Sequence, residues 1–453
     1  MKQILRYLGI IFCFLAPVHA DIVQFKLDNG LKVTIKPNYR APIAIVMIWY
    51  EVGSADEPPG LTGLSHMLEH MMFKGTKAVP NDQFTKIIAE NGGQMNAFTA
   101  QDYTAYYEKI AAQSIDIPLR LEADRMQNLQ LTEQDFAKEL NVVKEERRLR
   151  IEDNPEAITL ERLNATAYLS FAYQHPVIGW MADLSQINLP ALKKWYKRYY
   201  SPNNANLIIV GAVDPITIQR KIEHYFGKIP SKQLPKRILQ QEPQSLGAKS
   251  VNISKNAEQP IMMMAFAAPS LRYIELLNAT NPKEAQINPK TPYVLEVIAG
   301  ILDAGDNGRL NQELVNKQHV AAAANAFYDL YSLLATQFIF FAVPSAASNL
   351  EEVKKAILQQ INRLKTELVS AKELQRIKTQ LIAQKTYAED SLFSQASELG
   401  IVNSIGLASK VIDAYRTQIE AVTNNEIREC ANKYFSQSAL TVAQLQPSNS
   451  TRK

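Results

Sequence analysis

The chain has 453 residues, of which 46% are hydrophobic and 21% are charged, and its formal net charge at pH 7 is +4. A chain of this length is too long for one ordinary hydrophobic core, so we expect two or more domains. The near balance of basic and acidic residues gives no reason to expect a nucleic acid or an anionic membrane surface as a partner.

The first twenty residues are typical of a secretory signal peptide. Lys2 and Arg6 form a basic segment, residues 8–15 an apolar core, and residues 18–20 a small-residue cleavage site. The apolar run is well short of the about 20 residues that span a bilayer, and no later stretch is long and apolar enough. Without this segment the net charge is +2, and Cys430 remains as the one cysteine, which excludes an intrachain disulfide. We predict an exported protein, periplasmic or secreted, with no membrane span.

Periodicity and turn residues predict alternating strands and helices through the first half of the chain. The sequence Asp28-Asn29-Gly30 is a hairpin turn signature between alternating apolar and polar residues. Gly92-Gly93 separates a helical segment from two short strands. We expect a hairpin at residues 21–37, strands at 43–52, 94–99, 104–108 and 205–213, and helices at 64–73, 82–91, 115–126 and 132–150.

A proline-containing segment with little periodicity divides the chain. We predict a first domain at residues 21–230, a linker at 231–250 and a second domain at 251–453. The order of elements recurs faintly after the linker: residues 260–266 correspond to the strand that begins at residue 43, and residues 433–442 correspond to 199–208. The sequence therefore indicates an α+β fold made of two homologous domains.

The helix predicted at residues 64–73 carries the clearest chemical signal. At about 100° per residue, His66, Glu69 and His70 share one polar arc, while the opposite side is apolar. Two histidines one turn apart can bind one zinc ion, and the glutamate between them can take a proton from a water that the metal activates. This is the His-x-x-Glu-His arrangement. The alternative is a polar helix face that holds two histidines by chance, which the clean apolar back disfavours.

A catalytic zinc usually has three protein ligands, so one is missing from this helix. The charged helix at residues 132–150 offers candidates. Glu139 and Glu146 are two helical turns apart and lie on one side, whereas Glu145 points elsewhere. One of the pair can bind the metal and the other can brace a ligand, but the spacing does not say which. A charged helix that simply faces water is the alternative.

These residues resemble the inverted-motif zinc peptidases, the family of pitrilysin, insulin-degrading enzyme and the mitochondrial processing peptidase, in its single-unit, exported bacterial form. The motif at residues 66–70 is followed 76 residues later by a glutamate. The resemblance covers nearly the whole chain after the predicted signal peptide. Its other parts are residues 92–99 (GGQMNAFT), 102–107 (DYTAYY), 143–146 (VKEE), 152–155 (EDNP) and 200–204 (YSPNN).

The resemblance implies a function and a set of site residues. By it, His66, His70 and Glu146 bind one zinc ion per chain. Glu69 is then the general base, and Glu139 is the carboxylate that braces a metal ligand from behind. The reaction implied is zinc-dependent endopeptidase hydrolysis of peptides or unfolded polypeptide segments.

The resemblance also implies how the substrate binds and how chains assemble. An edge strand with Asn96, Ala97 and Phe98 takes the substrate as an additional strand, with little regard for its side chains. Each domain has a mainly antiparallel sheet packed with helices. Two such chains pair into a clam-like chamber, of which this chain is one half.

The sequence departs from the family at one point in its second half. Active relatives carry there an arginine and a tyrosine seven residues apart that reach the substrate. Alignment on residues 308–314 places these positions at Val315 and Ala322, which have no side-chain donor. Tyr328 or Tyr331 would have to stand in, although the spacing is wrong. We therefore predict a heterodimer in which a homologous metal-free subunit supplies the pair, with a homodimer as the alternative.

The competing function is that of a non-catalytic subunit, used for binding or assembly, with the same fold. The intact zinc motif argues against it, because a scaffold does not need Glu69. Within enzymes, a specific processing peptidase and a general degrading peptidase both remain open.

Overall fold

The computed structural model describes residues 22–81, 83–237, 241–280 and 286–448. The predicted signal peptide lies outside these ranges, so export stays a prediction. In the residues that are described, no helix has both the length and the apolar character needed to cross a membrane.

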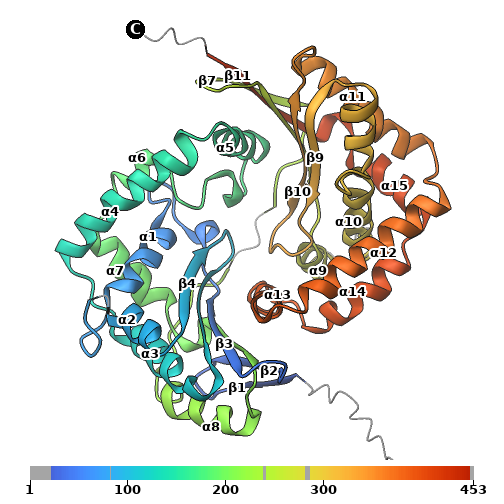
Figure 1. Cartoon of the computed structure of the whole chain (residues 1–453). Coiled ribbons are helices and arrows are strands. Elements are labelled where there is room, and N and C mark those ends of the chain that lie inside the picture. Colours follow the sequence, from blue (N-terminus) through green and yellow to red (C-terminus); the bar gives the residue numbers. More distant parts are fainter. Residues whose placement is uncertain (1–21, 82, 238–240, 281–285, 449–453) are drawn as a thin grey trace, which may run out of the picture.

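The first domain is built on a six-stranded sheet with the order β1-β2-β6-β3-β5-β4 (Figure 1). The predicted hairpin is present, since Val23 pairs with Ile35 and Lys26 with Lys32, and Gly30 takes a φ of +93° in the turn. The strand β4 lies at the open edge. The strands are β1 (Val23–Lys26), β2 (Lys32–Pro37), β3 (Ile43–Tyr50), β4 (Gln94–Thr99), β5 (Thr104–Ala111) and β6 (Ala205–Gly211).

The second domain repeats this topology. Its sheet has the order β7-β11-β8-β10-β9, and in both sheets one parallel pair, β2–β6 or β7–β11, accompanies antiparallel neighbours. Strand β8 takes the place of β3, and β11 the place of β6, as the faint recurrence in the sequence predicted. The α+β prediction with two homologous domains is thus confirmed. The strands are β7 (Lys249–Lys255), β8 (Ile261–Ala268), β9 (Ala321–Tyr328), β10 (Thr336–Pro344) and β11 (Leu440–Pro447).

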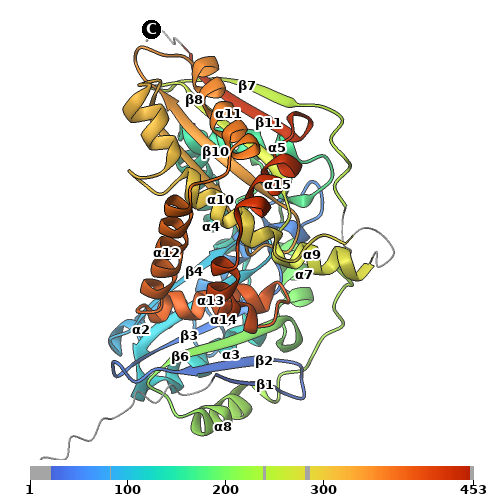
Figure 2. The same cartoon turned by 90° about the vertical axis from the view of Figure 1, so that its right-hand side faces the viewer.

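Helices pack on both sheets (Figures 1 and 2). Those of the first domain are α1 (Leu64–Met71), α2 (Gln83–Glu90), α3 (Asp116–Asn128), α4 (Glu133–Arg147), α5 (Pro155–Ala167), α6 (Met181–Leu184), α7 (Leu189–Tyr199) and α8 (Pro215–Phe226). Those of the second domain are α9 (Leu271–Thr280), α10 (Thr291–Leu302), α11 (Leu350–Thr366), α12 (Ala371–Ala388), α13 (Leu392–Ser404), α14 (Lys410–Glu420) and α15 (Asn424–Tyr434). The helix predicted at 132–150 changes to a π-helical turn, η4 (Arg148–Glu152), after α4.

Each domain lends one helix to the sheet of the other. Helix α5 packs on the second sheet, where Ile158 and Leu163 join a buried cluster with Met263 of β8. Helix α13 packs on β3 and β6 of the first sheet, and Gly400 lies so close to Trp49 that a Cβ there would be 2.0 Å from the indole ring. Figure 1 shows both helices between the two sheets. Because of this exchange, residues far apart in sequence fix the two domains against each other.

A carboxyl group in the second domain makes stability depend on pH. Burial, reinforced by the nearby Asp329, raises the pKa of Glu296 in α10 from 4.5 to about 7, although Tyr415 donates a hydrogen bond to it. The folded state therefore holds a proton between pH 4.5 and 7 that the unfolded chain releases. The stability that this proton provides is complete below pH 4.5 and is lost as the pH rises through about 7.

We expect Glu296→Gln to remove this pH dependence, because glutamine imitates the protonated carboxyl group. At pH 8 the variant should be more stable than the wild type by about 1 to 3 kcal/mol, and near pH 4 the difference should vanish. Urea unfolding at both pH values measures it. A variant that is less stable than the wild type at pH 8 contradicts the prediction.

Candidate metal centre

Helix α1 is fixed at its start by a buried carboxylate. Gly63 is the N-cap residue with a φ of +97°, and the carboxylate of Glu57 accepts hydrogen bonds of 2.6 Å from the backbone N–H groups of Gly63 and Ser65. Burial raises the pKa of Glu57 to about 8, although both hydrogen bonds favour the charged form. The apolar side of α1 is buried in the core, as predicted: Leu64, Leu68 and Met71 are at most 2% exposed.

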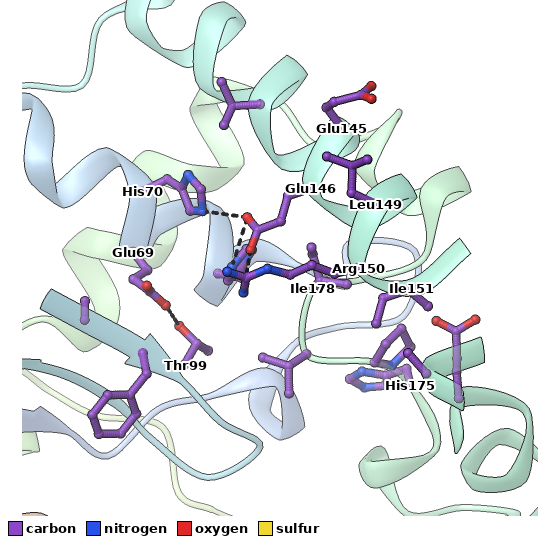
Figure 3. A pocket seen from close by; sticks show the side chains of 18 of the residues that line it. Glu69, His70, Thr99, Glu145, Glu146, Leu149, Arg150, Ile151, His175 and Ile178 are labelled. Atoms are coloured by element: carbon purple, nitrogen blue, oxygen red, sulfur yellow. Dashed lines mark hydrogen bonds and ion pairs between the residues drawn. The ribbon is translucent and has the colours of Figure 1, made fainter. Parts of the chain in front are cut away.

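The structure brings His66, His70 and Glu146 together. The Nε2 atom of His70 lies 3.1 Å from Oε2 of Glu146, and Nε2 of His66 lies 3.8 Å from the same oxygen. One ligand atom of each residue lies within 4.8 Å of the other two. The two predicted helices therefore meet at one point, and Glu146, not Glu139, is paired with Nε2 of both histidines. Figure 3 shows Glu146 beside His70.

Glu139 lies behind one of the histidines. Its Oε2 atom is 3.3 Å from Nδ1 of His70, and its Oε1 atom is 2.6 Å from the ammonium group of Lys74. Glu145 points away from the centre in Figure 3 and pairs with Arg148 at the surface. The sequence prediction that Glu139 and Glu146 share a side and Glu145 does not is thus correct as geometry.

Burial and neighbouring groups shift the pKa values of all three residues at the centre. Burial, together with the charge of His70, lowers the pKa of His66 to about 4. Burial by itself would lower the pKa of His70, but hydrogen bonds with Glu146 and Glu139 raise it above the ordinary value. The hydrogen bond with His70 holds the pKa of Glu146 below its usual range. The centre therefore offers a neutral imidazole and an ionised carboxylate near neutral pH, and a metal ion would compete with the proton of His70.

Glu69 points to the side of the centre where β4 ends. The hydroxyl of Thr99 donates a hydrogen bond of 2.5 Å to Oε2 of Glu69 (Figure 3). Burial raises the pKa of Glu69 above its ordinary value, against this hydrogen bond. A carboxylate whose pKa moves toward neutrality is better suited to exchange protons with water at physiological pH.

A cleft of about 1170 Å³ opens over these residues. Its lining residues all lie between His66 and Ile178, and they include Asn96, Ala97 and Phe98 of β4. The predicted substrate strand is thus an edge strand beside the centre. In this strand the backbone N–H of Ala97 donates a hydrogen bond of 2.9 Å to the side-chain oxygen of Asn96.

The sequence reasoning missed several residues that shape this centre. The carboxylate of Glu57 holds the start of α1. Lys74 forms an ion pair with Glu139, and Thr99 donates a hydrogen bond to Glu69. Arg150 forms an ion pair of 2.9 Å with Glu146. Thr99 lies at the end of a segment that was singled out, but nothing in its spacing marks it, because its partner Glu69 is distant in sequence. Arg150 lies four residues after Glu146, the spacing of an ion pair along a helix, and this signal could have found it.

The second-domain positions that depart from the family lie outside the cleft. Val315 packs against the core of the second domain in the π-helical turn η7 (Asn311–Lys317), and Ala322 is exposed on the edge strand β9. Both tyrosine hydroxyl groups have a hydrogen-bond partner within this chain. The hydroxyl of Tyr328 is buried and donates to the carbonyl of Pro269, and that of Tyr331 donates to Glu398. The suggestion that Tyr328 or Tyr331 replaces the missing tyrosine stays a prediction.

Comparison with known proteins gives the family. Residues 32–179 match the family model described as "Insulinase (Peptidase family M16)", and residues 186–381 match that described as "Peptidase M16 inactive domain". The chain belongs to the M16 peptidase family. The resemblance to pitrilysin, insulin-degrading enzyme and the mitochondrial processing peptidase is thereby confirmed.

Similar proteins extend over nearly the whole chain. "Zinc protease PqqE" of Helicobacter pylori is 28% identical over 95% of this chain and 93% of its own length. "Uncharacterized zinc protease YmxG" of Bacillus subtilis is 24% identical over 92% of this chain and 96% of its own length. The crystal structure of a protease from Helicobacter pylori superposes with a TM-score of 0.87 at 27% identity, covering 94% of this chain and all of that one. The family and the two-domain fold are therefore those of zinc proteases.

Proposed function

We propose that this protein is a zinc-dependent endopeptidase in which His66, His70 and Glu146 hold the metal and Glu69 is the general base. The observation that carries the proposal is the convergence of these four side chains from two helices in one cleft, beside an edge strand. A binding subunit without catalysis would have no use for a half-buried carboxylate held beside the three metal-ligand candidates.

The donor set fits a zinc ion. Imidazole nitrogens and carboxylate oxygens are atoms that zinc binds in proteins, and here one from each of the three residues lies within 4.8 Å of the others. Oε2 of Glu146 is 3.1 Å from Nε2 of His70 and 3.8 Å from Nε2 of His66. Two imidazoles and one carboxylate also leave a fourth position open, as in catalytic zinc sites. Glu139 supports the set from behind, through Nδ1 of His70.

The residues of the chain then have separate roles in the proposed hydrolysis. Zinc, when bound, supplies a Lewis acid that makes water acidic and polarises a peptide carbonyl. Glu69 accepts the proton of the attacking water and returns it to the leaving amine, for which its raised pKa is suitable. Thr99, the last residue of β4, holds the carboxylate of Glu69 in place through its hydrogen bond.

The edge strand β4 is our candidate for substrate binding. A peptide that adds to it as a further strand is held by backbone hydrogen bonds, which suits peptides or unfolded segments of many sequences. Asn96 caps the N–H of Ala97 in the free protein, so a substrate strand would take over this N–H. Phe98, also in the cleft, supplies an apolar contact.

The missing arginine and tyrosine support a pairing of two different chains. All residues that line the cleft come from the first domain, so a second chain is free to approach it. We propose that a homologous metal-free subunit contributes the donors absent at Val315 and Ala322, with a homodimer as the alternative, and that the protein acts after export.

Purification of this chain by itself tests the proposal. We expect one zinc ion per chain, measured by mass spectrometry of metals, and weak hydrolysis of an unfolded peptide that chelation abolishes and added zinc restores. Addition of a metal-free homologue from the same organism should raise the activity. Absence of zinc, or activity that resists chelation, contradicts the endopeptidase. Full activity of the single chain contradicts the heterodimer alone.

A further inference from the structure

Arg147, the residue after Glu146 at the end of α4, contacts both α5 and the turn at Gly179. The guanidinium of Arg147 is 3% exposed, and its Nη1 atom donates hydrogen bonds of 2.8 Å to Oε2 of Glu161 and to the carbonyl of Gly179. Its Nη2 atom donates a second bond, of 3.2 Å, to Oε1 of Glu161. Because the side chain of Glu161 is itself 2% exposed, this is a buried bidentate ion pair.

One of these contacts leads to the start of α1. The turn at Gly179, with a φ of +85°, packs on Thr62 and Gly63 so tightly that a Cβ on Gly179 would lie 2.2 Å from the carbonyl of Thr62. The hydroxyl of Thr62 also accepts a hydrogen bond of 3.0 Å from the backbone N–H of Trp180. Gly63 is the N-cap of the helix that carries both histidines. Arg147 thus holds the surface on which that helix begins.

The other contact leads to the second domain. Glu161 belongs to α5, the helix that packs on the second sheet through Ile158 and Leu163. A displacement of α5 on that sheet would therefore pull on Arg147, and through the backbone on Glu146 directly before it.

We propose that Arg147 is a positioning residue that fixes both metal-binding helices against each other and, through Glu161, against the sheet of the second domain. The inference rests on the proposed zinc site. A rigid frame is needed there because ligands from two separate helices must meet within a few tenths of an ångström. The second domain then contributes to the zinc affinity of the site in the first domain.

Zinc affinity, measured by competition with a chromophoric chelator, tests the role of Arg147. We expect Arg147→Met to weaken zinc binding by about tenfold or more and Glu161→Gln by a smaller factor, because Arg147 also holds the carbonyl of Gly179 and pairs with Glu152 at 3.4 Å. The double variant should lose no more than Arg147→Met, since the ion pair with Glu161 is already absent there. Arg147→Lys keeps the charge but not the planar fork, so it should show an intermediate loss. The visible spectrum of the Co²⁺-substituted protein should shift in the same order.

Arg309→Met is the matched control. Arg309 forms a bidentate pair with Glu373, at 2.8 and 2.7 Å, and neither residue lines the cleft, so this variant should lower the melting temperature without a change in zinc affinity. Unchanged zinc affinity in Arg147→Met would overturn the proposal. If that variant does not fold, unchanged affinity in Arg147→Lys overturns it. Failure of the wild type to bind zinc would instead refute the zinc site itself.

Neighbouring methionines of β8 test the connection to the second domain. Met263 faces α5, whereas Met264 faces the opposite core of the second domain, and both are buried. We expect Met263→Ala to weaken zinc binding several-fold and Met264→Ala to leave it unchanged. Equal zinc affinities in the two variants would show that the second sheet does not act on the site.

Discussion

Glu69→Gln is expected to bind zinc as the wild type does and to hydrolyse peptides about 10²- to 10⁴-fold more slowly. Glutamine has nearly the shape of glutamate and still accepts the hydrogen bond from Thr99, which in the wild type is 2.5 Å long. It cannot take a proton from water at neutral pH, so the loss should fall on kcat, with KM little changed.

Peptide cleavage and metal content, measured on the same preparation, check this expectation. Glu145→Gln is the control, because Glu145 also lines the cleft but is exposed and points away from the centre. It should retain both zinc and activity. Hydrolysis by Glu69→Gln at the rate of the wild type would show that another group, or none, accepts the proton.

Glu146→Gln is expected to lose zinc. Among the described residues that could bind a metal with them, the carboxylate of Glu146 is the group paired with both histidines. An amide oxygen is a much weaker ligand for zinc than a carboxylate. The affinity should therefore fall by more than the about 10- to 100-fold that follows the loss of an outer partner, which is the range expected for Glu139→Gln. Hydrolysis should fall with zinc occupancy.

Chelator competition on these two variants distinguishes their roles. The expected order of zinc affinity is wild type, then Glu139→Gln, then Glu146→Gln. The reverse order would exchange the roles of the two carboxylates. Circular dichroism of each variant checks that a loss of zinc does not reflect a loss of fold. This control is needed because Glu146 is also paired with Arg150 at the surface.

Features that depend on neighbours in sequence were predictable. The hairpin turn at Asp28-Asn29-Gly30, the amphipathic helix with His66 and His70, and the strands on both sides of the turn at residues 100–103 appear in the structure close to their expected bounds. In each case the signal is local: a turn that needs a positive φ, a period of 3.6, or an alternation of two.

The spacing could not decide which of Glu139 and Glu146 binds the metal, because two residues seven apart on a helix lie on the same side. Resemblance to a family favoured Glu146, and the packing of α4 on α1 places it between the histidines. The hydrogen bond between Thr99 and Glu69 likewise became visible only in the folded chain, whereas Arg150 lies four residues after Glu146, at the spacing of an ion pair along a helix.

The sequence by itself determined the motif helix and the α+β class, because these follow from periodicity and residue type along the chain. The duplication left only a faint recurrence in the sequence, and the family resemblance implied it. The tertiary structure decided which acid meets the histidines, that α5 and α13 are exchanged between the sheets, and that Arg147 joins α4 to α5 and to the start of α1. Such contacts join residues that are distant in sequence, and their geometry depends on how whole elements pack, which no local pattern records.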